Sequence, residues 1–158
     1  MKKLNILLVL GLALLLVSCA TVKTSDVKGK TVIVEIPGAS KDELFVKAST
    51  WMVETFNSSK SVTQYSDKEA GVIKGKYIIS FTQGLLDAEC ESIITIECKD
   101  EKCRIIISDP YGFMATDGRY TNKVTSIMES EYEKIQASIT NLCSSFETSM
   151  LKNNDTSW

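Results

Sequence analysis

The residues of this chain that first suggest chemistry are its five cysteines, and Cys19 has the most distinctive surroundings. It ends the motif Leu16-Val17-Ser18-Cys19, which follows a Met-Lys-Lys start and an apolar run over residues 4–17. A basic start, a short apolar segment and a small residue before the cleavage point are the parts of a secretory signal. In the lipoprotein version, the cysteine thiolate takes a diacylglyceryl group before cleavage. The motif therefore predicts a signal peptide at residues 1–18 and a mature chain that is attached to a membrane through acylated Cys19.

The other four cysteines are candidates for disulfides, because an exported compartment permits them. Cys98 and Cys103 face each other across a predicted hairpin turn and form the first candidate pair. A bridge between Cys90 and Cys143 is the second candidate, and buried free thiols are the alternative. The spacings of eight, five and forty residues lack the closely paired ligands of a four-thiolate zinc site, so we expect no metal.

The chain contains no histidine, the side chain used most often for acid–base catalysis near neutral pH. Ser-His-Asp and Cys-His nucleophile systems are therefore excluded, and an enzyme would have to rely on Asp, Glu, Lys or Tyr. Cleavage after residue 18 removes two lysines and leaves 16 basic against 20 acidic side chains. Because an acidic chain binds nucleic acid poorly, we expect no nucleic-acid partner, and no motif indicates a cofactor.

Residues 109–121 (DPYGFMATDGRYT) form the best candidate for a binding surface. They contain one proline, two glycines and three aromatics, which predicts an ordered loop, and loops on rigid scaffolds often carry function. The side chains of Tyr111, Phe113, Arg119 and Tyr120 are the candidates for holding a sugar, a peptide or a lipid. Alternatively, the same aromatics close the core where the last strand meets the final helix.

Alternating patterns predict the strands of a sheet that positions these residues. The run at residues 31–36 ends at Pro37-Gly38, and further strands are expected at residues 61–66, 72–82, 89–98 and 103–108. Pairing Cys98 with Cys103 also places Ile96 opposite Ile105, the register that keeps charged side chains out of the core. The turn at residues 83–87 carries two leucines, which cover the edge of the core or protrude toward a membrane or partner.

Two helices are expected to cover this sheet. Ser40 and Glu43 form a capping-box pattern, and apolar residues at helical spacing continue to Phe56. A second apolar seam predicts a helix over residues 122–151. The chain should therefore fold as an α+β two-layer sandwich, an antiparallel sheet with two helices on one face in the order β-α-β-β-β-β-α. Residues 19–30 would form the lipidated N-terminus and a flexible tether, residues 31–151 the domain, and residues 152–158 a frayed tail.

The stretch from Ser40 to Tyr77 resembles the signature of a known family. The matching segments include Trp51, Phe56-Asn57-Ser58, Gln64-Tyr65 and Asp67-Lys68-Glu69-Ala70-Gly71 followed by Ile73-Lys74-Gly75. The family is a domain of unknown function with a TATA-binding-protein-like (TBP-like) fold, found in lipoproteins and secreted proteins of Bacteroides-type bacteria. The resemblance implies this fold and no activity, cofactor or ligand. It does not imply DNA binding, because this is a single acidic copy and fold does not determine function.

These observations favour a non-enzymatic, lipid-anchored cell-envelope domain that binds a protein or small ligand near the membrane. We expect it at the outer membrane facing the periplasm, because residues 20–23 carry no acidic cluster resembling a surface-export signal. The alternatives are an exported carboxylate-dependent hydrolase or transferase and a purely structural envelope lipoprotein. A concave site with paired carboxylates would indicate the enzyme, whereas a shallow aromatic patch or exposed sheet face would indicate binding.

Overall fold

The structure, a computed structural model, describes residues 27–56, 63–83, 86–115, 120–121 and 129–152. The predictions for Cys19, for Arg119 and for the start of the second helix at residues 122–128 lie outside these residues. Along the chain the elements are β1 (Lys30–Glu35), α2 (Lys41–Thr55), β2 (Thr63–Asp67), β3 (Val72–Gln83), β4 (Leu86–Lys99), β5 (Lys102–Ile107), β6 (Tyr111–Ala115), β7 (Tyr120–Thr121) and α3 (Glu129–Leu151).

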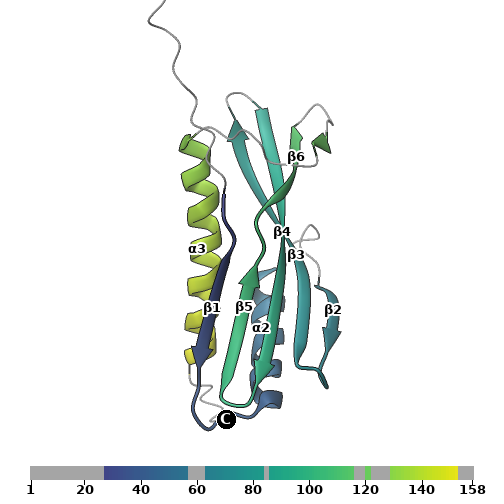
Figure 1. The fold of residues 1–158 in the computed structure, drawn as a ribbon, viewed down its shortest axis with the longest axis vertical. Helices are drawn as coiled ribbons and strands as arrows, with labels where there is room; N and C mark the ends of the chain where they lie inside the picture. The colour runs from purple at the N-terminus through teal and green to yellow at the C-terminus, as the bar shows by residue number, and fades with distance from the viewer. Residues whose placement is uncertain (1–26, 57–62, 84–85, 116–119, 122–128, 153–158) are drawn as a thin grey trace, which may run out of the picture.

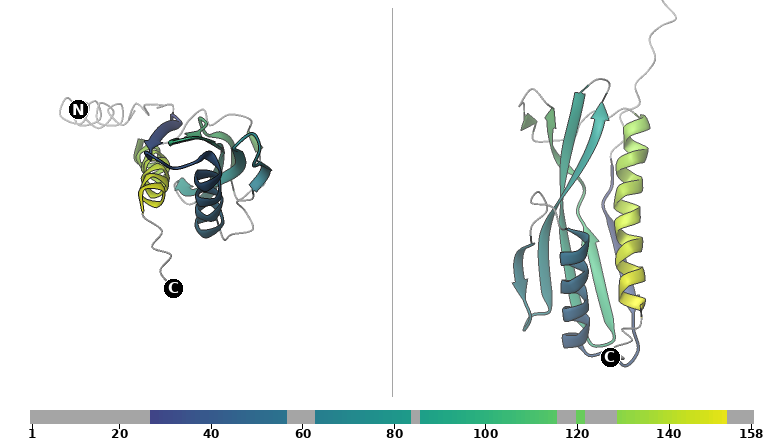
Figure 2. Two further views of the ribbon diagram at one scale, coloured as in Figure 1. Left: turned by 90° about the horizontal axis from the view of Figure 1, so that it is seen from below. Right: turned by 180° about the vertical axis from the view of Figure 1, so that it is seen from behind.

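The strands form one antiparallel sheet in the order β1-β5-β4-β3-β2. Strand β6 extends this sheet by pairing with the first part of β4, and β7 pairs with β6. Both α2 and α3 lie on the same face of the sheet (Figures 1 and 2). The predicted α+β sandwich with an antiparallel sheet and two helices on one face is therefore confirmed.

The register of the central hairpin is also the predicted one. Cys98 lies opposite Cys103, Ile96 opposite Ile105 and Ile94 opposite Ile107. All six of these side chains are buried beneath the helices. The alternate residues of the same strands point away from the core, so that a slip by one residue would bury charged groups.

Helix α2 begins with the predicted capping box. The Glu43 backbone N–H donates to Ser40 Oγ at 3.3 Å, and the Ser40 backbone N–H donates to Glu43 Oε2 at 2.8 Å. This exchange satisfies backbone groups that the first helical turn leaves free. The Lys41 backbone N–H in turn donates to Asp100 Oδ1 at 2.8 Å, which ties the start of α2 to the β4–β5 hairpin.

An aromatic cluster joins the two helices to the sheet. The Trp51 ring on α2 meets Phe146 on α3 edge-to-face with centroids 5.1 Å apart, and its Nε1 donates to Ser145 Oγ at 3.2 Å. Phe56 lies between Trp51 and Tyr77, with both centroid distances 5.8 Å. These ring contacts thus connect α2 with α3 and with β3.

Two differences from the sequence prediction matter for the site. Residues 109–121 were predicted to be an ordered loop, but they contain β6 and β7. The Ser108 N–H donates to Ile93 O at 2.9 Å, and after Asp109 and Pro110 the ladder resumes with Tyr111 opposite Glu91. The sequence suggested a loop because proline cannot donate to a ladder, whereas the structure places Pro110 between β5 and β6, outside both strands.

The second difference concerns the start of the domain. Residues 27–30 were assigned to the tether, yet the Val27 side chain is only 8% exposed and belongs to the core. The folded part of the described chain therefore begins at residue 27. None of the described helices is long and apolar enough to cross a membrane.

Candidate functional site

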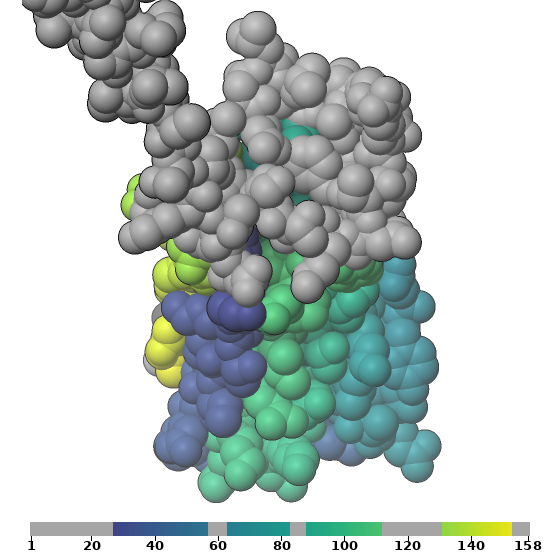
Figure 3. All heavy atoms as spheres, turned by 45° about the horizontal axis from the view of Figure 1, so that its top comes forward, coloured from purple at the N-terminus to yellow at the C-terminus, as the bar shows by residue number. Residues whose placement is uncertain are grey.

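The face of the sheet opposite the helices is the most extensive candidate site, and we call it the open face. Neither described helix covers it, and Figure 3 shows the strands β1, β5, β4, β3 and β2 side by side at the surface. Its cross-strand rows follow from the register: Ile33, Arg104, Glu97, Val72 and Asp67 form one row, and Thr31, Ile106, Thr95, Lys74 and Tyr65 form the next.

Large apolar side chains on this face are exposed to solvent. Ile33 on β1 is 58% exposed, Tyr65 on β2 is 50% exposed and Tyr111 on β6 is 40% exposed. They are distributed over both edges of the sheet and its β6 extension. The face therefore offers apolar contacts at several separate points rather than in one deep pocket.

The charges of the open face largely compensate each other. Lys76 Nζ lies 2.8 Å from Glu91 Oε1, and Arg104 pairs with Glu97. The charged residues at outward register positions of β1 to β5 are the basic Lys74, Lys76, Lys99, Lys102 and Arg104 and the acidic Glu35, Asp67, Asp87, Glu89, Glu91 and Glu97. A surface that binds nucleic acid concentrates positive charge. This face does not.

Hollows lie on both sides of the described part of the molecule, and one of about 530 Å³ beside α2 is lined by Phe45, Val46, Ser49, Thr50, Val53, Glu54 and Lys68. A cavity of about 190 Å³ on the open face is lined by Ile33, Glu97, Lys99, Lys102, Cys103 and Arg104. A groove of about 480 Å³ lies on the helix side, along α2 and the end of α3, and is lined by Asp42, Glu43, Val46, Lys47, Thr50, Glu54, Lys68, Ser149 and Lys152.

The polar groups of the helix-side groove serve structural roles. Lys47 Nζ donates to the Met150 carbonyl at 2.7 Å at the end of α3, and burial lowers the pKa of this amine. Asp42 pairs with Lys68 at 3.2 Å. The Ser40 N–H and hydroxyl lower the pKa of the Glu43 carboxyl, which is therefore held as an acceptor rather than prepared as a proton donor.

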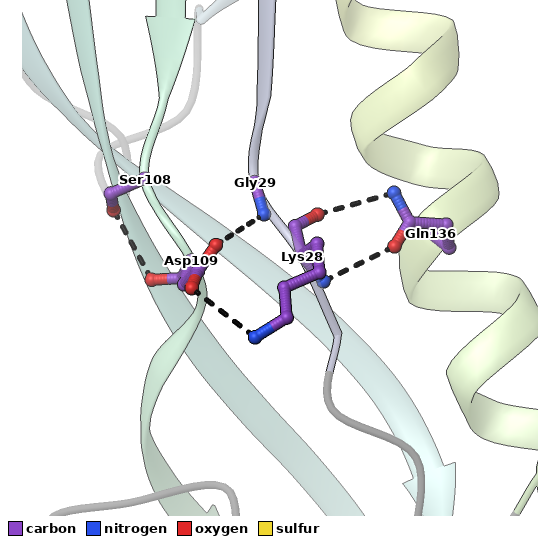
Figure 4. Close-up of polar contacts among 5 residues, drawn as sticks. All are labelled: Lys28, Gly29, Ser108, Asp109 and Gln136. Atoms are coloured by element: carbon purple, nitrogen blue, oxygen red, sulfur yellow. Dashed lines mark hydrogen bonds and ion pairs between the residues drawn. The ribbon is translucent and has the colours of Figure 1, made fainter.

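Four residues hold the place where the N-terminal segment joins the domain, and we call them the N-terminal clamp: Lys28, Gly29, Asp109 and Gln136 (Figure 4). The Gln136 side-chain amide accepts from the Lys28 N–H at 3.3 Å and donates to the Lys28 carbonyl at 3.2 Å. The Gly29 N–H donates to Asp109 Oδ1 at 2.7 Å, and Lys28 Nζ lies 3.8 Å from Asp109 Oδ2. The side-chain amide of Gln136 thus forms with the Lys28 backbone the two hydrogen bonds that a residue of a neighbouring strand would otherwise form.

Glycine is required at the centre of the N-terminal clamp. A Cβ atom at Gly29 would lie 2.1 Å from the Ile107 carbonyl oxygen and 2.6 Å from the carbonyl carbon of Ser108. Any side chain would therefore push the segment away from β5. The close approach holds residues 28 and 29 against the junction of β5 and β6.

The four described cysteines are buried free thiols, and no disulfide joins any of them. Cys98 and Cys103 lie opposite each other as expected, with their Sγ atoms 2.8 Å apart. The predicted disulfide pairs, including Cys90 with Cys143, are therefore absent from this structure. Burial raises the pKa of the Cys90 thiol to about 12 and also raises the pKa of Cys143. The shared hydrogen bond with Cys98 and burial raise the pKa of Cys103, so these three thiols are protonated near neutral pH and are poor nucleophiles.

The structure describes the predicted binding residues only in part. Tyr111 lies on the open face, whereas only the backbone of Phe113 and Tyr120 is described, with Phe113 opposite Thr121 and Tyr120 opposite Met114. Sequence reasoning missed Ile33 and Tyr65, although both occupy outward positions of alternating strands. It also missed the N-terminal clamp, because its residues are separated by 80 and 108 positions and carry no local pattern.

No group of three or more acidic or cysteine side chains arranged for a metal ion occurs among the described residues. The described part of the chain is thus a scaffold with an open sheet face, a balanced charge pattern and a fixed N-terminal junction. These features define a two-layer α+β protein that presents one side of its sheet.

Comparison with known proteins gives this fold a family. The model described as "Domain of unknown function (DUF4468) with TBP-like fold" matches residues 31–111, just over half of the chain, and the chain belongs to this family. The predicted resemblance and the TBP-like fold are thereby confirmed. No curated protein matches the chain.

Two solved structures share the fold. A DUF4468 family protein from Bacteroides ovatus is 16% identical with a TM-score of 0.64, and the alignment covers 87% of this chain and 94% of the other. A TBP-like protein from Parabacteroides distasonis is 13% identical with a TM-score of 0.56, covering 80% of this chain and 97% of the other. At these identities the likeness concerns the fold alone.

Proposed function

We propose that this protein is a lipid-anchored cell-envelope protein, attached through acylated Cys19, whose open face binds another envelope protein. The observation that carries this proposal is the set of exposed apolar side chains on the open face, Ile33, Tyr65 and Tyr111, among mutually compensated charges. Aromatic and aliphatic anchors surrounded by polar groups are typical of protein interfaces.

A protein partner fits the open face better than a small ligand does. Small-molecule sites usually enclose roughly 300–1,000 Å³ and are mainly apolar, whereas the cavity on this face encloses about 190 Å³ and four of its six lining residues are charged. The groove of about 480 Å³ on the helix side is lined mostly by charged and polar residues, some of which hold α2 and α3 in place. A broad, shallow surface favours a macromolecule.

The test is capture of partners by the full-length acylated protein after cross-linking in intact envelopes. Ile33→Glu places a charge at the most exposed apolar position of the open face. The matched control is Val53→Glu on the outer side of α2, where the side chain is 71% exposed. We expect Ile33→Glu to reduce recovery of the partner by about tenfold or more, equivalent to ~1.4 kcal/mol or more of binding free energy.

Both variants should fold, because surface substitutions away from special features usually change stability by about 0.5 kcal/mol or less. Capture of the same partner at the same yield by the wild type and Ile33→Glu would refute an interface on the open face. Loss of the partner in Val53→Glu alone would place the interface on the helix side instead.

A further inference from the structure

One end of the open face carries positive charge that the described structure leaves uncompensated. The β4–β5 ladder ends with Lys99 opposite Lys102, and both residues are exposed on this face. Residues directly opposite each other in an antiparallel pair have Cβ atoms roughly 5 Å apart, and like charges at this spacing are unfavourable. The hairpin keeps this arrangement although its turn contains two acidic residues, Asp100 and Glu101.

The acidic residues of that turn are bound elsewhere. Asp100 Oδ1 accepts from the Lys41 N–H at 2.8 Å, and Glu101 Oε1 accepts from the Gly38 N–H at 3.1 Å. Both carboxylates therefore hold the connection between β1 and α2. Neither forms an ion pair with the two lysines among the described residues.

Two further carboxylates lie near the lysines, but neither balances them. Arg104 Nε donates to Glu97 Oε2 at 3.1 Å and Nη2 donates to the same oxygen, so the charge of Glu97 is already matched. Glu35 lies opposite Lys102 on β1 and forms no ion pair in the described structure. Three cationic side chains and one carboxylate line the cavity on the open face, so its lining has an excess of positive charge.

The same cavity has an apolar wall. Ile33 on β1 lines it together with the lysines, and its side chain is 58% exposed. Ile33 lies opposite Arg104, whereas Lys99 and Lys102 form the next outward pair, two residues along the strands. Outward positions two residues apart are separated by roughly 6.6 Å at ~3.3 Å per residue. An extended chain has the same spacing between its own alternate side chains, so one such chain can contact both positions.

We propose that the cavity on the open face binds an acidic side chain of the protein partner, with its carboxylate between Lys99 and Lys102, and that an apolar side chain two residues away packs against Ile33. This inference rests on the proposed protein-binding role of the open face. Electrostatic complementarity of this kind selects partners. The cavity encloses about 190 Å³, less than the roughly 300–1,000 Å³ of small-molecule sites, so it suits one side chain.

The charge of the cavity favours a carboxylate over a phosphate group. A carboxylate carries one negative charge, whereas a phosphate monoester carries about 1.5 to 2 at neutral pH. The carboxylate of Glu97 also lines the cavity, and it repels a doubly charged ligand more strongly than a singly charged one.

The test titrates the capped peptide Leu-Ser-Glu-Ser-Leu into the isotope-labelled full-length acylated protein in detergent micelles, and NMR follows the backbone amides of Ile33, Lys99 and Lys102. The leucines stand two residues on either side of the glutamate, so either chain direction provides the proposed spacing. A matched peptide has glutamine in place of glutamate and therefore the same leucines without the charge. We expect the glutamate peptide to bind with a Kd about tenfold lower, because only its carboxylate pairs with the two ammonium groups.

A double variant, Lys99→Gln with Lys102→Gln, tests the site in the protein. It should fold, because it removes two opposed like charges from exposed positions. We expect it to bind the glutamate peptide about tenfold more weakly than the wild type does. The matched control is Lys74→Gln, which changes an exposed lysine elsewhere on the open face and should keep the wild-type affinity.

Equal affinity of the wild type for the two peptides, or equal affinity of the wild type and the double variant for the glutamate peptide, would overturn the carboxylate site. Inorganic phosphate that shifts the same amides at lower concentrations than the peptide does would overturn it in favour of a phosphate ligand. These outcomes leave the interface on the open face intact, because that interface is tested separately by partner capture with Ile33→Glu. The two proposals can therefore fail separately.

Discussion

At the scale of single residues, two glycines separate two reasons for requiring glycine: a left-handed backbone conformation, and a lack of room for a Cβ atom. Gly38 and Gly71 both have a positive φ, 81° and 68°. A Cβ at Gly38 would meet no atom within 4 Å, whereas a Cβ at Gly71 would lie 2.5 Å from the Cys98 carbonyl oxygen. The same Cys98 donates its N–H to the Gly71 carbonyl at 2.8 Å.

We expect Gly38→Ala to lower the free energy of unfolding by about 1 kcal/mol, because only the left-handed conformation is penalised. Gly71→Ala should cost about 3 kcal/mol, because the added methyl also pushes β3 away from β4. Urea denaturation of the two variants measures the difference. Equal losses would show that the ladder can move aside at Gly71.

The buried thiols give the protein a dependence on alkaline pH. Burial raises the pKa of Cys90 to about 12, above the ~8.5 of a thiol in the unfolded chain. The unfolded state therefore loses its proton first, and the contribution of Cys90 to stability is complete below pH ~8.5 and is lost as the pH rises toward 12.

We expect the free energy of unfolding to fall between pH 8.5 and 10.5, by up to ~1.4 kcal/mol per pH unit for each such thiol. Cys90→Ala should make this slope shallower, whatever its effect on stability at pH 7. Denaturation at a series of pH values gives both slopes. An unchanged slope in Cys90→Ala would contradict the role assigned to its burial.

At the scale of elements, the N-terminal clamp connects the first residues of the domain to α3 and to the β5–β6 junction. Its hydrogen bonds involve backbone groups of Lys28 and Gly29 that no strand pairs in the described structure. Side chains of Gln136 and Asp109 take the place of that strand. The start of β1 should therefore be the part of the sheet that opens most easily when one of these side chains is removed.

Gln136→Ala removes a donor and an acceptor together, and we expect it to lower the free energy of unfolding by about 1–2 kcal/mol. The Lys28 amide should also exchange with solvent faster, while amides of β4 keep their protection. Hydrogen exchange followed by mass spectrometry measures this. Asn141→Ala, at an exposed position of α3, is the control, and equal exchange in both variants would refute the role of Gln136.

The elements themselves were largely predictable, for local reasons. The capping box of α2 and the register of β4 with β5 depend on residues close in sequence, so the patterns at Ser40 and around the Lys99–Lys102 turn were sufficient. Strand β6 was not predicted because Pro110 suggested a loop, and only the pairing of Tyr111 with Glu91 makes a strand there possible.

At the scale of the whole molecule, the proposed function depends on where the protein is held. In the proposed function, a signal peptide at residues 1–18 directs export and Cys19 is acylated, and two acyl chains give stable attachment where one is marginal.

Cys19→Ala should therefore carry no lipid and should keep residues 1–18, because acylation of the thiolate precedes cleavage of the signal peptide. Metabolic labelling with palmitate and the mass of the intact protein measure this. For the periplasmic placement, protease added to whole cells should leave the wild-type protein intact. Digestion in whole cells would place it on the outer surface, and palmitate labelling of Cys19→Ala equal to that of the wild type would refute acylation at Cys19.

The sequence alone determined which face of each strand and helix is buried. The alternation in β4 and β5 and the apolar seams of the helices decide which side chains are buried, because burial of one face excludes every other register. Only the tertiary structure decided that β6 extends the sheet and that Lys28 and Gly29 meet Gln136 and Asp109. The contacts of the N-terminal clamp join residues 80 and 108 positions apart, and they form only when the whole chain has packed.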